Sequence, residues 1–221
     1  MTSQKQLRVQ HRQERLARER ASAAAARRDR WLRRGALAVV GVAAFPLVIT
    51  AILGATGAGN TEGLASGPAP WPAETAHLRA RLTTLKFPPN GDESYHIHAL
   101  LHVYVDGAPV IVPADIGISA ADRIESPLHT HDITGIIHIE AGQRHDFKLA
   151  DFFAVWGVTF SDPQLGGYHN AGDRTVQVFA NGQAVSDPAS YVVHAHDNIV
   201  VAYGAPGSFP TQPPADALDG L

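Results

Sequence analysis

A long stretch without any charged side chain constrains this 221-residue chain most. No Asp, Glu, Lys or Arg stands between Arg34 and Glu62, and the residues from Gly35 to about Thr56 are rich in Ala, Val, Leu, Ile and Phe. About twenty such residues in a helix cross the hydrocarbon core of a bilayer. The sequence therefore predicts one transmembrane helix over residues 35–57, with the lipid bilayer as its partner.

The distribution of charge predicts the orientation of this helix. Residues 1–34 hold eleven Lys and Arg and three acids, a net charge of +8, whereas the remainder holds seven basic and eighteen acidic residues, a net charge of −11. Arginines crowd the N-terminal flank of the apolar stretch, so the positive-inside rule keeps the N-terminus cytoplasmic. We expect a retained signal anchor in the cell membrane, with the C-terminal domain outside the cytoplasm. Cleavage as a signal peptide is the alternative, but cleaved signals usually have a shorter apolar core.

The remaining segments follow from composition. Residues 1–34 form a basic cytoplasmic tail that we expect to lie against anionic lipid headgroups, with no nucleic acid as partner. Residues 58–72 are rich in Gly, Ala, Ser and Pro and indicate a flexible spacer. Residues 206–221 contain four prolines and indicate a disordered tail. An extracytoplasmic domain over 73–205 remains.

This domain is expected to be mainly β. Apolar and polar residues alternate with period two, which predicts strands over 96–105, 110–112, 133–139, 146–148, 176–179 and 199–203. The dipeptides Asp106-Gly107 and Asn181-Gly182 are typical of tight hairpin turns. Apolar residues at helical spacing predict short helices over about 73–85 and 149–156. The predicted fold is a compact antiparallel β domain with one or two short helices, preceded by one transmembrane helix.

Histidines are concentrated in one part of this domain, and cysteine is absent. Seven lie between Tyr95 and His145, and Met1 is the only methionine. The seven are His96, His98, His102, His129, His131, His138 and His145. Alternate residues of a strand point to the same face, so each His-x-His pair presents two ring nitrogens in one direction. Without sulfur ligands, the pattern predicts a transition-metal site of imidazole and carboxylate.

Two pairs lead the candidate ligands. His96 and His98 lie opposite an apolar set in their strand, and His129 and His131 form the second pair. Asp132 is placed to accept the free ring N–H of a ligating histidine. His138 is either the third ligand of its segment or a buried, hydrogen-bonded histidine. The predicted metal ligands are thus His96, His98, His129, His131 and His138.

His194-Ala-His196-Asp197 repeats the His-x-His-Asp pattern near the C-terminus. This third pair strengthens the prediction of metal binding, because one pair alone would be unremarkable. With nitrogen and oxygen ligands only, Cu(II) leads and Zn(II) follows as the divalent cofactor. The predicted function is capture, delivery or tolerance of this metal at the cell surface.

Two alternatives stay open. One is a metal-dependent oxidase, dismutase or hydrolase, in which Glu140 or Asp132 carries protons. The other is a metal-free interaction module of the cell envelope, whose histidines respond to pH. No Gly-x-Ser-x-Gly elbow, phosphate-binding loop or dinucleotide fingerprint is present, which argues against serine hydrolase and nucleotide chemistry.

The phrase Leu-His-Thr-His-Asp-x-Thr-Gly-x-Ile-His-Ile-Glu ends at Glu140 and is followed by Phe-x-Leu-x-x-Phe-Phe-x-x-Trp-Gly. Together these motifs resemble a group of uncharacterised, membrane-anchored, His-rich extracytoplasmic proteins of actinobacteria and some archaea. The resemblance covers most of the domain. It implies a shared fold and little more, because the group has no assigned function.

Overall fold

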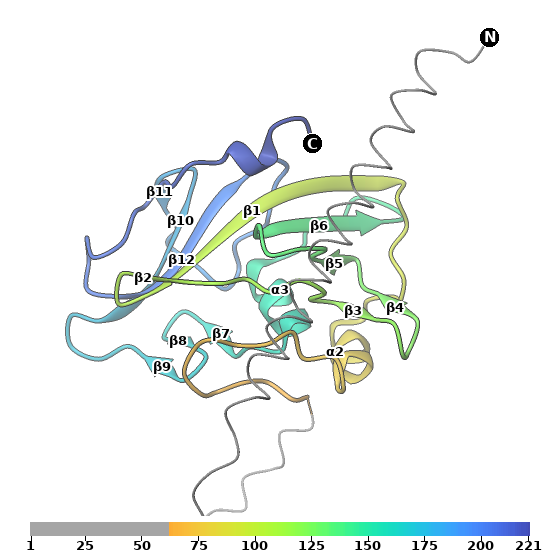
Figure 1. Ribbon diagram of the computed structural model, residues 1–221, viewed down its shortest axis with the longest axis horizontal. Helices are drawn as coiled ribbons and strands as arrows, with labels where there is room; N and C mark the ends of the chain where they lie inside the picture. The colour runs from red at the N-terminus through yellow and green to blue at the C-terminus, as the bar shows by residue number, and fades with distance from the viewer. Residues whose placement is uncertain (1–61) are drawn as a thin grey trace, which may run out of the picture. The chain divides into compact units, whose positions relative to one another are not determined.

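The computed structural model describes residues 62–221 (Figure 1). The predicted basic tail, the predicted transmembrane helix over 35–57 and the first part of the predicted spacer lie outside the described residues. Within 62–221, the helices are too short to cross a membrane.

A mixed seven-stranded sheet forms the centre of the described region. Its strands follow the order β11-β10-β12-β1-β6-β5, and β2 pairs with β1 beside β6. The bounds are Tyr95–Val105 (β1), Ala108–Val110 (β2), Leu128–His129 (β5), Ile136–Ala141 (β6), Thr175–Ala180 (β10), Gln183–Ala184 (β11) and Asn198–Gly204 (β12). The expected β-rich domain with two short helices is confirmed, and neighbouring strands are antiparallel except β1 and β12, which run parallel.

Strand β1 is long because it has different neighbours along its length. Its first half pairs with β6, from Tyr95 opposite Ala141 to Leu100 opposite Ile136. Its second half pairs with β12 on the other side and with β2 through the hairpin. The hairpin turns predicted from Asp-Gly and Asn-Gly are confirmed, since both residues of each turn have positive φ, as the two-residue primed turn requires.

The other elements are short. Two small sheets consist of β3 (Ile118–Ser119) with β4 (Ile124–Glu125), and of β7 (Phe160–Ser161), β8 (Gln164–Leu165) and β9 (Tyr168–His169). The helices are α2 (Leu78–Leu85), α3 (Leu149–Trp156) and the 3-10 helix η1 (Asp216–Leu218). The predicted helix over 149–156 is confirmed, and its apolar face is fully buried. The strand predicted over 146–148 is wrong, because in that segment only Lys148 forms an isolated bridge, to Val192.

The two faces of the main sheet differ in chemistry. One face carries the core, where Ala99, Leu101, Ile137 and Ile139 are almost completely buried together with the apolar face of α3. The alternate residues of β1, β6 and β5 point to the opposite face, and most of them are histidines. Burial of the core face thus fixes the side of the sheet on which the histidines lie.

The C-terminal segment packs against the histidine-bearing face farther along the sheet. Residues 206–221 were expected to form a disordered tail, but Phe209 is only 7% exposed and Leu218 only 8% exposed. Phe209 packs on Val200 and Ala202 of β12, and η1 lies beside β1. The prolines predicted disorder, whereas these two apolar side chains gain enough burial to hold the segment on the sheet.

Candidate metal centre

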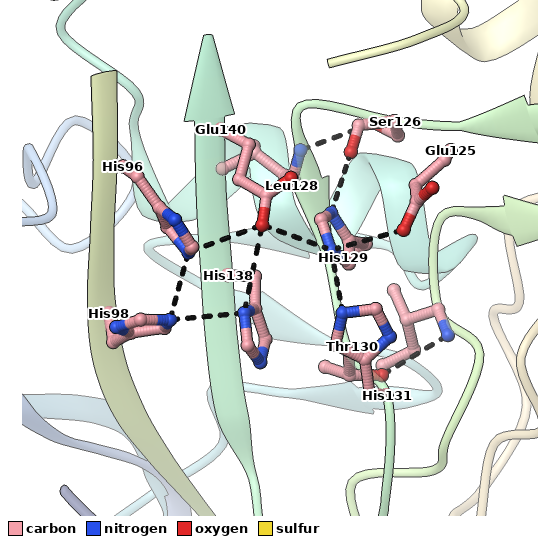
Figure 2. A network of polar contacts seen from close by, with 11 residues as sticks. His96, His98, Glu125, Ser126, Leu128, His129, Thr130, His131, His138 and Glu140 are labelled. Atoms are coloured by element: carbon pink, nitrogen blue, oxygen red, sulfur yellow. Dashed lines mark hydrogen bonds and ion pairs between the residues drawn. The ribbon is translucent and has the colours of Figure 1, made fainter. Parts of the chain in front are cut away.

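Three adjacent strands bring the five predicted ligands together. His98 of β1 stands opposite His138 of β6, and His138 stands opposite His129 of β5. His96 stands opposite Glu140 in the neighbouring row. Figure 2 shows these side chains turned toward one another across the three strands. The register of the sheet thus brings the two His-x-His pairs close to each other, with His138 between them.

The intervening residues hold these side chains in place. Thr130, between His129 and His131, is fully buried on the other side of the chain. Its hydroxyl donates to the carbonyl of Pro113 at 2.8 Å and accepts from the amide of Ile116 at 3.2 Å. Because alternate side chains point to opposite sides of an extended segment, anchoring Thr130 presents its two histidine neighbours to the centre.

The first triad consists of His96, His98 and His138. The Nε2 atom of His98 lies 3.0 Å from Nε2 of His96 and 3.1 Å from Nδ1 of His138. The three ligand atoms lie within 4.8 Å of one another, and the rings are exposed at His96 and partly buried at the other two positions. The triad opens toward solvent on the β1 side.

The second triad consists of His129, His131 and the same His138. The Nε2 atoms of His129 and His131 lie 3.2 Å apart, and the three ligand atoms again lie within 4.8 Å of one another. The Nδ1–H of His129 donates to the carbonyl of Ser126 at 2.8 Å. In the neutral ring this bond leaves the lone pair on Nε2, which is the arrangement found in metal-ligating histidines.

Glu140 lies among both triads. Its Oε1 atom is 3.2 Å from Nε2 of His96 and 3.9 Å from both Nε2 of His129 and Nδ1 of His138. Sequence reasoning considered Glu140 only as a proton carrier. The signal for a ligand was its position two residues after His138, which places both side chains on one face of β6.

Glu125, which the sequence did not single out, has its Oε1 atom 3.7 Å from Nε2 of His129 and is half exposed. It stands at the rim of the second triad. Ser126, next to it, was also missed, because the contact is made by its backbone carbonyl and any residue type could supply one.

The short distances between histidine nitrogens are explained better by a shared metal ion than by hydrogen bonds between the rings. A neutral imidazole nitrogen carries either one hydrogen or one lone pair, so Nε2 of His98 can complete one hydrogen bond and not two. It nevertheless faces nitrogens at 3.0 and 3.1 Å. Metal–nitrogen bonds of about 2.0–2.1 Å separate neighbouring ligand nitrogens by about 2.9 Å at right angles and by about 3.4 Å at tetrahedral angles. The observed separations match those of ligands around a metal ion.

The surroundings of His98, His129 and His138 favour the neutral form of their rings, which is the form that binds a cation. Burial, the largest cause, and the neighbouring histidines together lower the pKa of His129 to about 4 and that of His138 to about 3. Burial, followed by His96, also lowers the pKa of His98. These rings are neutral at pH 7, so their lone pairs are available without loss of a proton. Burial raises the pKa of Glu140, which indicates that its carboxylate gains from a positive charge nearby.

The two Asp residues that follow His-x-His have other roles. Asp132 was expected to support a ligating histidine, but its Oδ1 accepts from the amide of Thr134 at 2.8 Å and from the hydroxyl of the same residue. Asp197 is 4% exposed and accepts from Asn181 at 2.8 Å and from the hydroxyl of Tyr191 at 2.7 Å. Both carboxylates thus organise turns.

The remaining histidines lie outside the two triads. His196 sits at a left-handed turn with φ 62°, where its amide donates to the carbonyl of His98, and His194 is mostly exposed. His194 and His196 therefore do not lie in a strand, and their rings are not held on one face as in the other two pairs. His102 shares the face of His98, but burial lowers its pKa and its ring lies beside Asn198 of β12.

Comparison of the chain with models of protein families, with curated proteins and with solved structures gives no match. The arrangement of residues in the fold is therefore what bears on function.

Proposed function

We propose that this protein binds a divalent transition metal on the histidine-bearing face of its main sheet, for capture, delivery or tolerance of the metal outside the cytoplasm. One observation carries the proposal: Nε2 of His98 faces two other imidazole nitrogens at 3.0 and 3.1 Å, a geometry that hydrogen bonds alone leave unsatisfied. A cation between these nitrogens satisfies all of them.

Copper is the metal that the ligand set favours. Imidazole and carboxylate bind copper, zinc and nickel, and for such ligands affinity peaks at Cu(II). The described residues contain no sulfur ligand, so a thiolate or thioether site for Cu(I) is not available. We therefore propose Cu(II) as the preferred ion and Zn(II) as the second.

The proposed location rests on the apolar stretch over 35–57 and on the arginines that precede it. Under the positive-inside rule, this stretch anchors the protein in the cell membrane and keeps residues 1–34 in the cytoplasm. The metal-binding domain then faces outward, where it meets metal ions before they reach the membrane.

The experiment uses the full chain, purified in detergent through a tag without histidine. Metal content is measured by elemental analysis, and Cu(II) and Zn(II) affinities are measured by competition with chelators of known affinity. The test variant His96→Ala/His131→Ala removes one exposed ring from each triad and leaves the buried rings in place. We expect the unmodified protein to bind Cu(II) with submicromolar affinity and the variant to lose at least about 100-fold.

The matched control is His77→Ala/His169→Ala, which removes two exposed histidines outside both triads. It should bind as tightly as the unmodified protein. Circular dichroism establishes that each variant keeps its fold. Metal content no higher than that of an unrelated protein, or equal losses in the test and control variants, would contradict the proposal.

A further inference from the structure

The site contains two groups of ligands rather than one. His96, His98 and His138 form the first triad, and His129, His131 and His138 form the second. Building on the proposed function, we propose that this face of the sheet binds two metal ions side by side, with the carboxylate of Glu140 bridging them.

The strand order separates the two groups. β1 and β5 lie on opposite sides of β6, so they are two strand spacings apart, about 9.5 Å. Each outer strand supplies a His-x-His pair, and the middle strand supplies His138 and Glu140. One ion lies between β1 and β6, and the other lies between β6 and β5. Their separation is then close to one strand spacing, similar to the roughly 4 Å found in two-metal sites.

A single ion would not engage all the ligands. Ligand atoms bonded to one ion at about 2.1 Å lie at most about 4.2 Å from one another. The five histidines nevertheless divide into two groups even when 4.8 Å is allowed between ligand atoms. Each of these groups contains one His-x-His pair, which favours one ion for each pair.

The shared residues divide between the ions according to their chemistry. The Nδ1 atom of His138 has one lone pair and can bind one ion, and its 3.1 Å distance to Nε2 of His98 assigns it to the ion beside β1. Glu140 has two carboxylate oxygens and can bind both ions. Its Oε1 atom is 3.2 Å from His96 in the first triad and 3.9 Å from His129 in the second.

The ion beside β1 thus has three imidazoles and a carboxylate. The ion beside β5 has two imidazoles and the same carboxylate, with Glu125 at the rim 3.7 Å from Nε2 of His129. The second ion is therefore the less enclosed by protein ligands, and it should dissociate first. Unequal affinities of this kind suit a protein that exchanges metal with a partner.

The test counts ions per chain in the full-length, untagged protein after titration with Cu(II) and removal of excess metal. Native mass spectrometry gives the stoichiometry, and electron paramagnetic resonance shows whether two Cu(II) ions are magnetically coupled. We expect two ions per chain, and a resonance signal weaker and broader than two isolated ions give.

Pair variants locate the two ions. His96→Ala/His98→Ala and His129→Ala/His131→Ala should each retain one ion with the sharp signal of isolated Cu(II), while the control His77→Ala/His169→Ala retains two coupled ions. One ion per unmodified chain, or two ions without magnetic coupling, would overturn the bridged pair and leave the proposed function intact. No bound ion would overturn both. Circular dichroism on each variant separates loss of an ion from loss of the fold.

Discussion

At the residue scale, the same sequence motif serves two purposes. Both Asp132 and Asp197 follow a His-x-His pair, yet their carboxylates hydrogen-bond to other groups and belong to neither triad. The first caps an exposed turn. The second is buried and accepts from two side chains and from the amide of His194 at 2.9 Å. Burial and the number of donors therefore predict which carboxylate matters for stability.

This difference gives a prediction about stability. Asp197→Ala removes a buried carboxylate that accepts part-buried hydrogen bonds from Asn181 and Tyr191, so we expect it to lower the free energy of unfolding by about 3 kcal/mol. Asp132→Ala should cost about 1 kcal/mol or less, because its partners reach water. Urea unfolding of the chelator-treated variants provides the comparison. Equal losses would contradict the assignment of Asp197 as the organiser of its loop.

At the element scale, the sequence predicted the strands better than their arrangement. The alternation of residues predicted β1 and β6, and Asp106-Gly107 predicted the turn that follows β1. Strand order depends on contacts between distant segments, so the parallel pairing of β1 with β12 left no local signal. The same reason explains the site. The ligand types followed from His-x-His spacing, whereas their grouping around His138 needed the register of three strands.

The C-terminal segment provides a prediction at this scale. Phe209 packs with the ring of Tyr104 at 6.4 Å and with that of Phe179 at 6.2 Å between centroids. Phe209→Ala removes this cover from β12 and should lower the free energy of unfolding by about 3 kcal/mol. Leu221→Ala is the control, because Leu221 is 41% exposed and should cost less than about 0.5 kcal/mol. Thermal and urea unfolding provide the measurement. A loss of unfolding free energy at Phe209 no larger than at Leu221 would support the expectation of a disordered tail instead.

At the scale of the whole molecule, acidity and stability are linked through the buried histidines. In the unfolded chain the His129 ring has its ordinary pKa near 6.5, and in the folded, metal-free protein burial lowers this pKa to about 4. The unfolded form therefore binds more protons between these values. Stability is fully present above about pH 6.5 and is lost as the pH falls toward 4. The Ser126 carbonyl, Glu125, His131 and His96 surround the ring and modify this response.

The corresponding prediction concerns the chelator-treated protein. Between pH 6.5 and pH 5, the free energy of unfolding should fall with a slope that His129→Asn reduces by about 1 kcal/mol per pH unit. Denaturant unfolding at a series of pH values measures the slope. The control variant His169→Asn, which replaces an exposed histidine, should leave this slope unchanged. An equal slope in the unmodified protein and in His129→Asn would show that the ring at 129 does not resist protonation.

The absence of cysteine makes the proposed membrane orientation directly testable. Single variants Ser3→Cys and Asp219→Cys introduce the only thiol at either end of the chain. In intact cells, a membrane-impermeant maleimide should label Asp219→Cys and leave Ser3→Cys unlabelled until the membrane is opened with detergent. The reverse pattern, or labelling of neither end before lysis, would contradict the proposed extracytoplasmic domain.

All the residues of the two triads and Glu140 come from one continuous stretch, 96–140, whereas β12 returns to β1 from about a hundred positions farther along the chain. The pairing of His98 with His138 closes a shorter stretch of chain than the pairing of Leu100 with Asn198, and contacts between more distant segments form more slowly. The histidine-bearing face is thus able to assemble before β12 joins β1.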